Sequence, residues 1–429
     1  MKGNGVKWMR IGLAVMLALA MAGGIAAATA DGEFVPRLNT QTACTVTVAG
    51  HYDNFEALEK EFNLFRQYYP NVILEYTKLD DYNGTIGIAL PGEEAPDIYF
   101  AFPWMDSRDD CEAVFTSAED LSDPSLGIDL TCLRSNLLYT DEAGAVLIVP
   151  VYTTTYGMLV NETIFEKEGL TVPRTYAELT AACAALKEAG YANPIMGYNR
   201  SNFLLYPLYF PYFCAQIRDN PDAVRALNEM QPAAGEYMRS ALELAADFMS
   251  HGFIDLESCN QLENDYNAVI MRFFEGDVPM MLASVNTVSG TEKREAKSDA
   301  YQANPFAYGF YPVPSTESGG YFLNMVSLGF AVNRNSENLD MANEFMRFLI
   351  TTERLNEMAE AKRMMSPCTN MPLEGVYAAY GELDDSHVIC QTELGLADAP
   401  DIQVRIAGWL VSNGMMTVDE AVEAFGTLE

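Results

Sequence analysis

Histidine, the side chain most often used for proton transfer in enzymes, is scarce in this chain. The 429 residues contain three histidines, His51, His251 and His387. Neither H-E-x-x-H, G-x-S-x-G nor G-x-x-x-x-G-K-[ST] occurs, so zinc proteases, serine hydrolases of the α/β type and P-loop enzymes are not indicated. No G-x-G-x-x-G follows a strand pattern either. We therefore expect no dinucleotide and no other cofactor.

Carboxylates are abundant, and several lie next to each other in the sequence. Adjacent pairs include Asp80-Asp81, Glu93-Glu94, Asp109-Asp110 and Asp384-Asp385. With 60 acidic residues, such pairs arise by chance and usually belong to a solvated surface. A glycosidase needs two carboxylates at a particular separation in space, and the sequence does not show that separation. A secreted hydrolase therefore stays open as a less favoured alternative. No EF-hand loop is present, and we expect no metal site.

One short segment mixes flat apolar rings with a carboxylate. Phe102, Trp104 and Asp106 lie within five residues. Phe102 ends an apolar run at 98–102 that predicts a strand, and the other two follow it. A sugar site needs this combination, because aromatic rings stack on the C–H face of a sugar and carboxylates accept hydrogen bonds from its hydroxyls. The alternative for Trp104 is ordinary packing in a core.

The elements around this segment predict a doubly wound α/β fold. Residues 44–50 alternate in strand fashion, a helix with Asp53 as its cap is expected from Phe55 to Pro70, and 72–76 reads as a second strand. Ligands of such folds bind beyond the carboxyl ends of the strands. This places His51, Tyr52 and Asp53, after the first strand, beside Phe102, Trp104 and Asp106.

Later segments continue the alternation of strands and helices. Residues 146–151 and 156–160 predict strands around a Thr-Thr-Thr turn, and 322–332 contains strand-like runs. Capping boxes at Thr175–Glu178 and Thr417–Glu420 predict two helix starts. Helical patterns are also expected at 235–250, 261–275, after Ser336, and at 401–412.

Charge and composition restrict the partners. The net charge is −34 and 49% of residues are hydrophobic, which excludes a disordered tail and makes nucleic-acid binding an unfavourable interpretation.

The N-terminus has the pattern of an export signal. Lys2, Lys7 and Arg10 precede an apolar run from Ile11, and Ala28-Thr29-Ala30 fits a cleavage site. We expect residues 1–30 to be removed, giving an extracellular or cell-envelope protein. Retention of residues 11–30 as a membrane anchor is the alternative.

All eight cysteines lie beyond this signal, so disulfides are permitted in the exported chain. The sequence cannot assign them. Cys111–Cys132 and Cys368–Cys390 are the first pairings to expect because each pair flanks one loop-like segment, while Cys183 fits a buried thiol within a helix.

Ordered motifs across the chain resemble the extracellular solute-binding proteins of ABC importers, of the maltose-binding type. Residues 55–72 are similar to the first helix and the following strand of that family, and Ala95-Pro96-Asp97-Ile98 to its A-P-D-I strand entry. Residues 150–178, 273–282, 333–349 and 417–421 match further segments in the right order.

The resemblance implies two doubly wound α/β lobes joined by hinge segments, a periplasmic-binding-protein-like fold of type II. The lobes would comprise 44–152 plus 326–367, and 153–325 plus 368–429. A monomer without catalytic activity would capture a carbohydrate between the lobes and deliver it to a membrane permease. A ligand of another kind on the same fold, such as a polyamine, peptide or metal chelate, is the alternative.

The resemblance also implies ligand contacts from hinge and second lobe. At the first crossing these are Tyr152, Thr154 and Tyr156. In the second lobe they are Asn199, Arg200, Ser201, Phe203, Asn286, Asp401 and Arg405. Asn286 and Asp401 replace stacking Trp residues of the maltose type, so a mono- or disaccharide, short oligosaccharide or sugar derivative is expected rather than a long maltodextrin. A surface ion pair is the alternative for Arg405.

Overall fold

The computed structural model describes residues 34–262, 266–283, 287–289 and 291–428. The chain from Leu38 onward forms one compact unit of mixed α/β structure. Among the described residues no helix is both long and apolar enough to cross a membrane.

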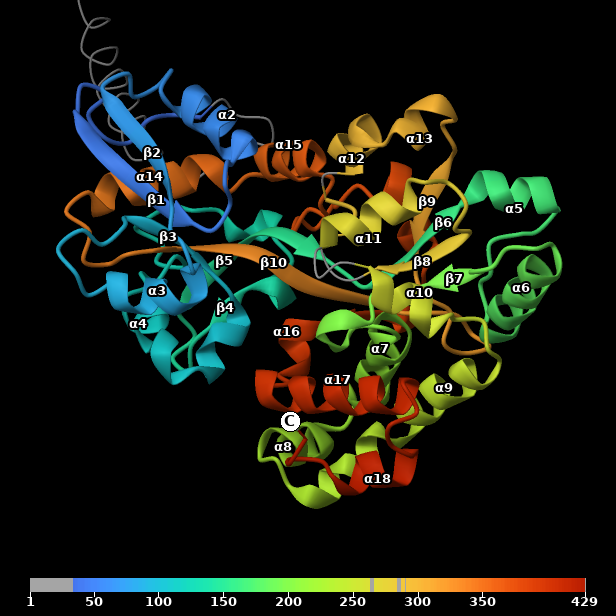
Figure 1. Cartoon of the computed structure of the whole chain (residues 1–429). Helices are drawn as coiled ribbons and strands as arrows, with labels where there is room; N and C mark the ends of the chain where they lie inside the picture. Colours follow the sequence, from blue (N-terminus) through green and yellow to red (C-terminus); the bar gives the residue numbers. More distant parts are fainter. Residues whose placement is uncertain (1–33, 263–265, 284–286, 290, 429) are drawn as a thin grey trace, which may run out of the picture. The chain divides into compact units, whose positions relative to one another are not determined.

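The described strands form two sheets, labelled in Figure 1. The first has seven strands in the order β2-β1-β3-β10-β5-β4, with β11 paired to β10, and the second has four in the order β7-β8-β6-β9. Their bounds are β1 Cys44–Gly50, β2 Val72–Lys78, β3 Ile98–Ala101, β4 Tyr139–Thr140, β5 Val146–Thr154, β6 Gly157–Asn161, β7 Ile195–Met196, β8 Met280–Ala283, β9 Tyr308–Tyr311, β10 Phe322–Val332 and β11 Val388–Cys390.

Strands β1, β2 and β3 are parallel, as the alternation of strand and helix predicts. Asp97 helps to fix this arrangement. Its carboxylate accepts hydrogen bonds from the Thr47 backbone N at 2.6 Å and from the Ser336 hydroxyl, so it joins β1 to the segment that follows β10. Because the three strands run the same way, their carboxyl ends lie at one edge of the sheet.

The long strand β10 contributes to two cores. Its last residues pair antiparallel with β3, while Met325 and Val326 pair with Thr154 and Thr153 of β5. Its first residues, Phe322 and Leu323, belong to the hydrophobic core of the second sheet. The expected Thr-Thr-Thr turn is therefore wrong: Thr153 and Thr154 are strand residues, held by β10, and only Thr155 and Tyr156 separate β5 from β6.

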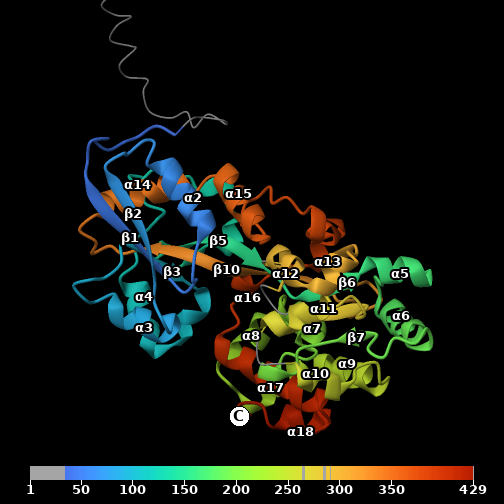
Figure 2. The ribbon, with the colours of Figure 1, turned by 45° about the horizontal axis from the view of Figure 1, so that its top comes forward.

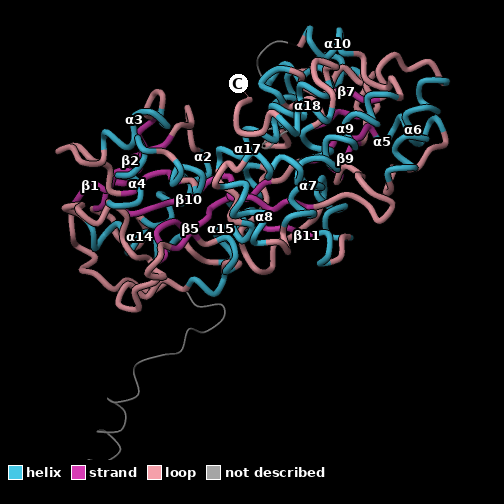
Figure 3. The backbone as a smooth tube through the Cα atoms, turned by 90° about the horizontal axis from the view of Figure 1, so that it is seen from below, coloured by secondary structure: helices cyan, strands magenta, loops and turns pink. Residues whose placement is uncertain are grey.

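Helices surround both sheets, as Figures 2 and 3 show from two further directions. Their bounds are α2 Glu56–Phe65, α3 Tyr82–Ala89, α4 Glu112–Thr116, α5 Glu162–Glu168, α6 Tyr176–Glu188, α7 Tyr206–Ile217, α8 Pro221–Asn228, α9 Arg239–Ser250, α10 Leu256–Gln261, α11 Tyr266–Phe273, α12 Thr291–Lys297, α13 Asp299–Ala303, α14 Leu339–Leu349, α15 Thr352–Lys362, α16 Gln391–Leu394, α17 Asp398–Ser412 and α18 Val418–Glu423.

Helix starts follow the sequence signals in two cases and depart from them in a third. The capping boxes at Thr175 and Thr417 are formed, each with both reciprocal hydrogen bonds. Asp53, in contrast, does not cap α2. Its carboxylate is bound by Lys78 Nζ at 2.8 Å, and the helix begins after Phe55 without a side-chain cap.

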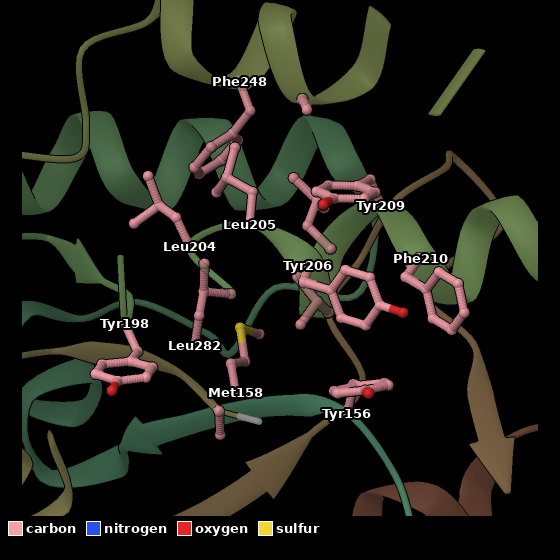
Figure 4. Close-up of a cluster of buried hydrophobic side chains, with 14 of the residues drawn as sticks. Tyr156, Met158, Tyr198, Leu204, Leu205, Tyr206, Tyr209, Phe210, Phe248 and Leu282 are labelled. Atoms are coloured by element: carbon pink, nitrogen blue, oxygen red, sulfur yellow. The ribbon is translucent and has the colours of Figure 1, made fainter. Parts of the chain in front are cut away.

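Large aromatic residues fill the core beside the second sheet, shown in Figure 4. The ring of Tyr206 stacks on Phe210 with centroids 4.3 Å apart, and Tyr156 meets Tyr206 edge-on at 5.0 Å. Tyr156 directly precedes β6 and Tyr206 begins α7, so this contact ties α7 to the crossing between the sheets.

All eight cysteines have free thiols, and neither expected disulfide is present. The Cys390 thiol donates to the Asn136 carbonyl at 3.0 Å, and the Cys111 thiol lies 3.7 Å from a carboxylate oxygen of Asp110. Cys132 instead adjoins Cys368, because residues 133 and 368 pair as an antiparallel bridge. Cys183 is fully buried in α6, as its helical context predicts.

Candidate functional site

A cavity of about 750 Å³ opens at the carboxyl ends of β1, β2, β3 and β5. It is lined from the first sheet by His51, Tyr52, Lys78, Leu79, Asp80, Asp81, Tyr82, Asn83, Phe102, Trp104, Thr154, Met325, Val326 and Ser327. From the other side it is lined by Tyr156, Tyr206, Gln391, Asp398, Asp401 and Arg405. The structure therefore brings His51, Tyr52, Phe102 and Trp104 together at the edge of the sheet where the strands end.

Aromatic rings form the first wall. Trp104 stacks on Phe102 with centroids 5.8 Å apart and an angle of 19° between the planes. His51 meets Phe100 edge-on at 5.4 Å, and burial lowers the pKa of its imidazole. His51 is therefore neutral near pH 7, where it offers one hydrogen-bond donor and one acceptor.

The opposite wall carries a coupled tyrosine and carboxylate. The Tyr206 hydroxyl, at the start of α7, donates a hydrogen bond to Asp401 in α17. Burial raises the pKa of Asp401 to about 6, and the bond from Tyr206 and the charge of Arg405 oppose that shift. Burial likewise raises the pKa of Asp398, one turn earlier.

Arg405 is held in place by packing rather than by an ion pair. Its guanidinium lies over the ring of Phe203, 4.9 Å from the centroid. Among the described residues Arg405 makes no ion pair, and its buried Nε has no hydrogen-bond partner. The surface ion pair considered for Arg405 is not found among the described residues, and the charge of Arg405 acts on the Asp398 and Asp401 carboxylates of the same wall.

The end of β2 and the loop after it add charged residues to the cavity. The adjacent pair Asp80-Asp81 was expected on a solvated surface. Lys78 Nζ pairs with Asp53 at 2.8 Å and with Asp80 at 3.3 Å, and Asp80 and Asp81 line the cavity. The strand-end rule, applied to the second strand as well as the first and third, would have found them.

Three other lining residues were missed or discounted. Asp398 and Gln391 enter from helices near the C-terminus, and no local pattern marks them. Tyr206 is both buried and part of the cavity wall, and its place among closely spaced aromatic residues is typical of a core.

Several predicted site residues lie outside this cavity. Asp53 and Tyr152 line a neighbouring cavity of about 460 Å³ that shares Tyr52. Asp106, with Trp104, lines another of about 570 Å³. Tyr152 is fully buried, and its hydroxyl has no partner among the described residues.

Residues 199–203 do not line the cavity, and those whose side chains are described contact the elements around it. The Asn199 side chain bonds to Asn260, Asn413 and the Trp409 indole N–H, and Arg200 donates to the Leu262 carbonyl. Phe203 does not line the cavity, but its ring packs against the guanidinium of Arg405. Asn286 and the side chain of Ser201 lie outside the described part of the structure.

Within the described ranges no group of three His, Cys, Asp or Glu side chains is close enough to hold a metal ion. The cavity combines flat rings, a neutral imidazole, carboxylates and the Arg405 guanidinium, which makes no ion pair with the residues that the structure describes. Such a set can bind a polar molecule through stacking and hydrogen bonds.

Residues 56–384 match the family of bacterial extracellular solute-binding proteins. The chain belongs to this family. No curated protein matches it. As the family is extracellular, this solute-binding protein is exported, and it is a binding protein rather than an enzyme.

Solved structures with the same fold include three proteins that have been solved with a sugar or a sugar-like ligand. RafE from Streptococcus pneumoniae aligns with a TM-score of 0.69 at 17% identity, over 89% of this chain and 97% of that one, and RafE has also been solved with raffinose. The GacH receptor of Streptomyces glaucescens, solved with acarbose, gives 0.65 at 17% identity over 90% and 97%. A sugar transporter from Bacillus licheniformis in complex with stachyose gives 0.60 at 17% over 89% and 98%.

Proposed function

We propose that this protein is the substrate-binding component of an ABC importer and that it captures a carbohydrate in the cavity at the strand ends. The observation that carries the proposal is the pairing of the Phe102–Trp104 stack with the guanidinium of Arg405 on the opposite wall. A sugar offers a flat C–H face to the rings and hydroxyls to Arg405 and the carboxylates. The raffinose, acarbose and stachyose bound by similar structures support this ligand class.

Capture requires movement, because a ligand that contacts both walls must first enter between them. We propose lobes of 44–152 plus 326–367 and of 153–325 plus 368–429. Their crossing includes Thr155–Tyr156, the short link between β5 and β6. The ligand favours a closed form through contacts made only there, and a membrane permease then receives the closed monomer.

The affinity sets how many contacts the ligand needs. Micromolar binding corresponds to about −8.2 kcal/mol. Charge-assisted hydrogen bonds contribute roughly 1.5–3 kcal/mol each, so a handful of them together with one or two stacked rings is needed to reach this value after the cost of ordering ligand and side chains.

A polyamine is the second candidate. Asp80, Asp81, Asp398 and Asp401 line the cavity, against the cationic Lys78 and Arg405. This excess of carboxylates would attract a cationic ligand.

Calorimetric titration against raffinose, stachyose, maltose, chitin oligosaccharides and spermidine tests the assignment. We expect micromolar binding of at least one sugar. Arg405→Ala and Trp104→Ala should each weaken it by tenfold or more. Arg200→Ala is the matched control, since Arg200 is exposed and lies outside the cavity, and its affinity should equal that of the wild type.

Two results would contradict the proposal. Binding of spermidine with no response to any sugar would favour the polyamine. Conversion of the sugar during the titration, detected by chromatography, would point to a hydrolase.

A further inference from the structure

Two cysteines far apart in the sequence are held side by side by the backbone. Cys132 ends the 3₁₀ turn Leu130–Cys132, and Cys368 follows α15. The Thr369 N–H donates to the Cys132 carbonyl at 2.9 Å, and the Arg134 N–H donates to the Pro367 carbonyl at 3.1 Å. The two thiols hydrogen bond to each other, and the Cys132 thiol also approaches the Asp129 carbonyl at 3.4 Å.

The surroundings make one of these thiols reactive. The Cys368 thiol is bonded by Cys132, Ser366 and Thr352, the first residue of α15, and the charge of Arg134 acts on it too. These contacts, led by the bond from Cys132, lower the pKa of Cys368 to about 7, whereas the pKa of Cys132 is raised. A cation and a helix N-terminus are typical neighbours of reactive thiolates.

We infer that Cys132 and Cys368 form a disulfide bond when the exported protein meets a disulfide oxidant. The partly exposed Cys132 passes its proton to the neighbouring Cys368 thiolate as it attacks one sulfur of the oxidant, which gives a mixed disulfide and releases the first half of the oxidant as a thiolate. That thiolate takes the proton from Cys368 and leaves as a thiol. The Cys368 thiolate then attacks Cys132 Sγ and releases the second half, which takes a proton from water. The oxidant gains the two electrons and two protons that the cysteines lose.

The structure distinguishes this pairing from its rivals. Cys390 is the other cysteine close to Arg134, but its thiol is engaged by the Asn136 carbonyl rather than by Cys368. Cys111 lies against α3, where its thiol approaches the Asn83 carbonyl at 3.8 Å. Only the Cys132 thiol contacts Cys368 among these candidates.

The bond would fasten a segment that adjoins the crossing between the sheets. Met365, three residues before Cys368, pairs with Thr153 near the end of β5, and its carbonyl accepts from the Thr153 N–H at 2.8 Å. A bond from Cys368 to Cys132 fixes this segment to the 130–134 turn and restricts the unfolded chain. The inference does not depend on which ligand the cavity binds.

Mass spectrometry of the exported form tests the pairing. The protein is incubated with oxidised glutathione, blocked with N-ethylmaleimide and digested. Trypsin alone leaves Cys111 with Cys132 and Cys368 with Cys390, since no Lys or Arg separates either pair. A glutamate-specific protease must therefore follow, cutting after residues such as Glu119 and Glu374. We expect a linked peptide of Cys132 with Cys368.

Thermal unfolding with and without a reductant gives a second readout. Oxidised wild type should melt at a higher temperature than the same sample reduced. That difference should vanish in Cys132→Ser and Cys368→Ser, and it should persist in the control Cys390→Ser. A linked Cys368–Cys390 peptide, or two blocked thiols at Cys132 and Cys368 after oxidation, would overturn the inference.

Discussion

At the scale of single residues, Asp401 is the most strongly perturbed carboxylate of the cavity. Burial raises its pKa in the folded protein to about 6, whereas an aspartate in an unfolded chain ionises near about 3.9. The folded state therefore binds the proton more tightly than the unfolded state does. This contribution to stability is complete below about pH 3.9 and is lost as the pH rises through 6.

A comparison of wild type with Asp401→Asn isolates this effect, because asparagine does not titrate. Between pH 5 and pH 7.5 the wild type should lose on the order of 1 kcal/mol of unfolding free energy relative to the variant. Urea denaturation at both pH values measures this difference. A difference between wild type and Asp401→Asn that is the same at both pH values would refute the assigned pKa.

Some cavity residues could be predicted from the sequence, because they follow strands that run in the same direction. His51, Tyr52, Phe102 and Trp104 follow parallel strands, so their convergence needs only the strand order. Asp398 and Gln391 were not predictable, because their approach depends on how α17 packs against α7 and how α16 packs against β10. A carboxylate's sequence neighbours do not reveal such packing.

At the scale of elements, α17 places two cavity residues and depends on a glycine to do so. A Cβ at Gly408 would lie 2.1 Å from Cζ and 2.2 Å from the hydroxyl of the buried Tyr209 in α7. Gly408 therefore sets how closely α17 approaches α7, and with it the position of Asp401 and Arg405.

Gly408→Ala should move α17 away from α7 and thereby weaken both the fold and the site. We expect a loss of about 1–3 kcal/mol in unfolding free energy, typical of overpacking, and a lower ligand affinity. Denaturation and calorimetry measure the two effects. Gly381→Ala is the control, since the nearest atom to its added Cβ is Leu373 Cβ at 3.4 Å. If Gly408→Ala had the stability and affinity of the wild type, the Tyr209 side chain would have shifted without a movement of α17, and the expectation would be wrong.

The start of a helix could be predicted where no distant side chain binds the capping residue. Thr175 and Thr417 have a glutamate three residues on and no other partner, and both form the expected caps. Asp53 has the same local pattern, but Lys78 at the end of β2 binds its carboxylate. The Thr153–Thr154 pair illustrates the same point, because pairing with β10 extends β5 beyond the turn that its sequence indicates.

At the scale of the whole molecule, the question is whether the two walls of the cavity move together when a ligand binds. Residues from both sides line one cavity, and Thr155–Tyr156 is the short link where β5 passes into β6. A ligand that contacts both walls stabilises the closed population only by the difference between its affinities for the two forms. Tight binding alone would leave the distribution of forms unchanged.

Small-angle X-ray scattering can measure this redistribution. With the sugar that binds in calorimetry at saturating concentration, we expect a smaller radius of gyration than without ligand. Arg405→Ala removes a contact from one wall, so it should need a higher sugar concentration for the same decrease. A sugar that does not bind is the control and should leave the scattering unchanged. An unchanged radius of gyration at calorimetric saturation would mean that the ligand binds a single form, and the proposed closure would then be wrong.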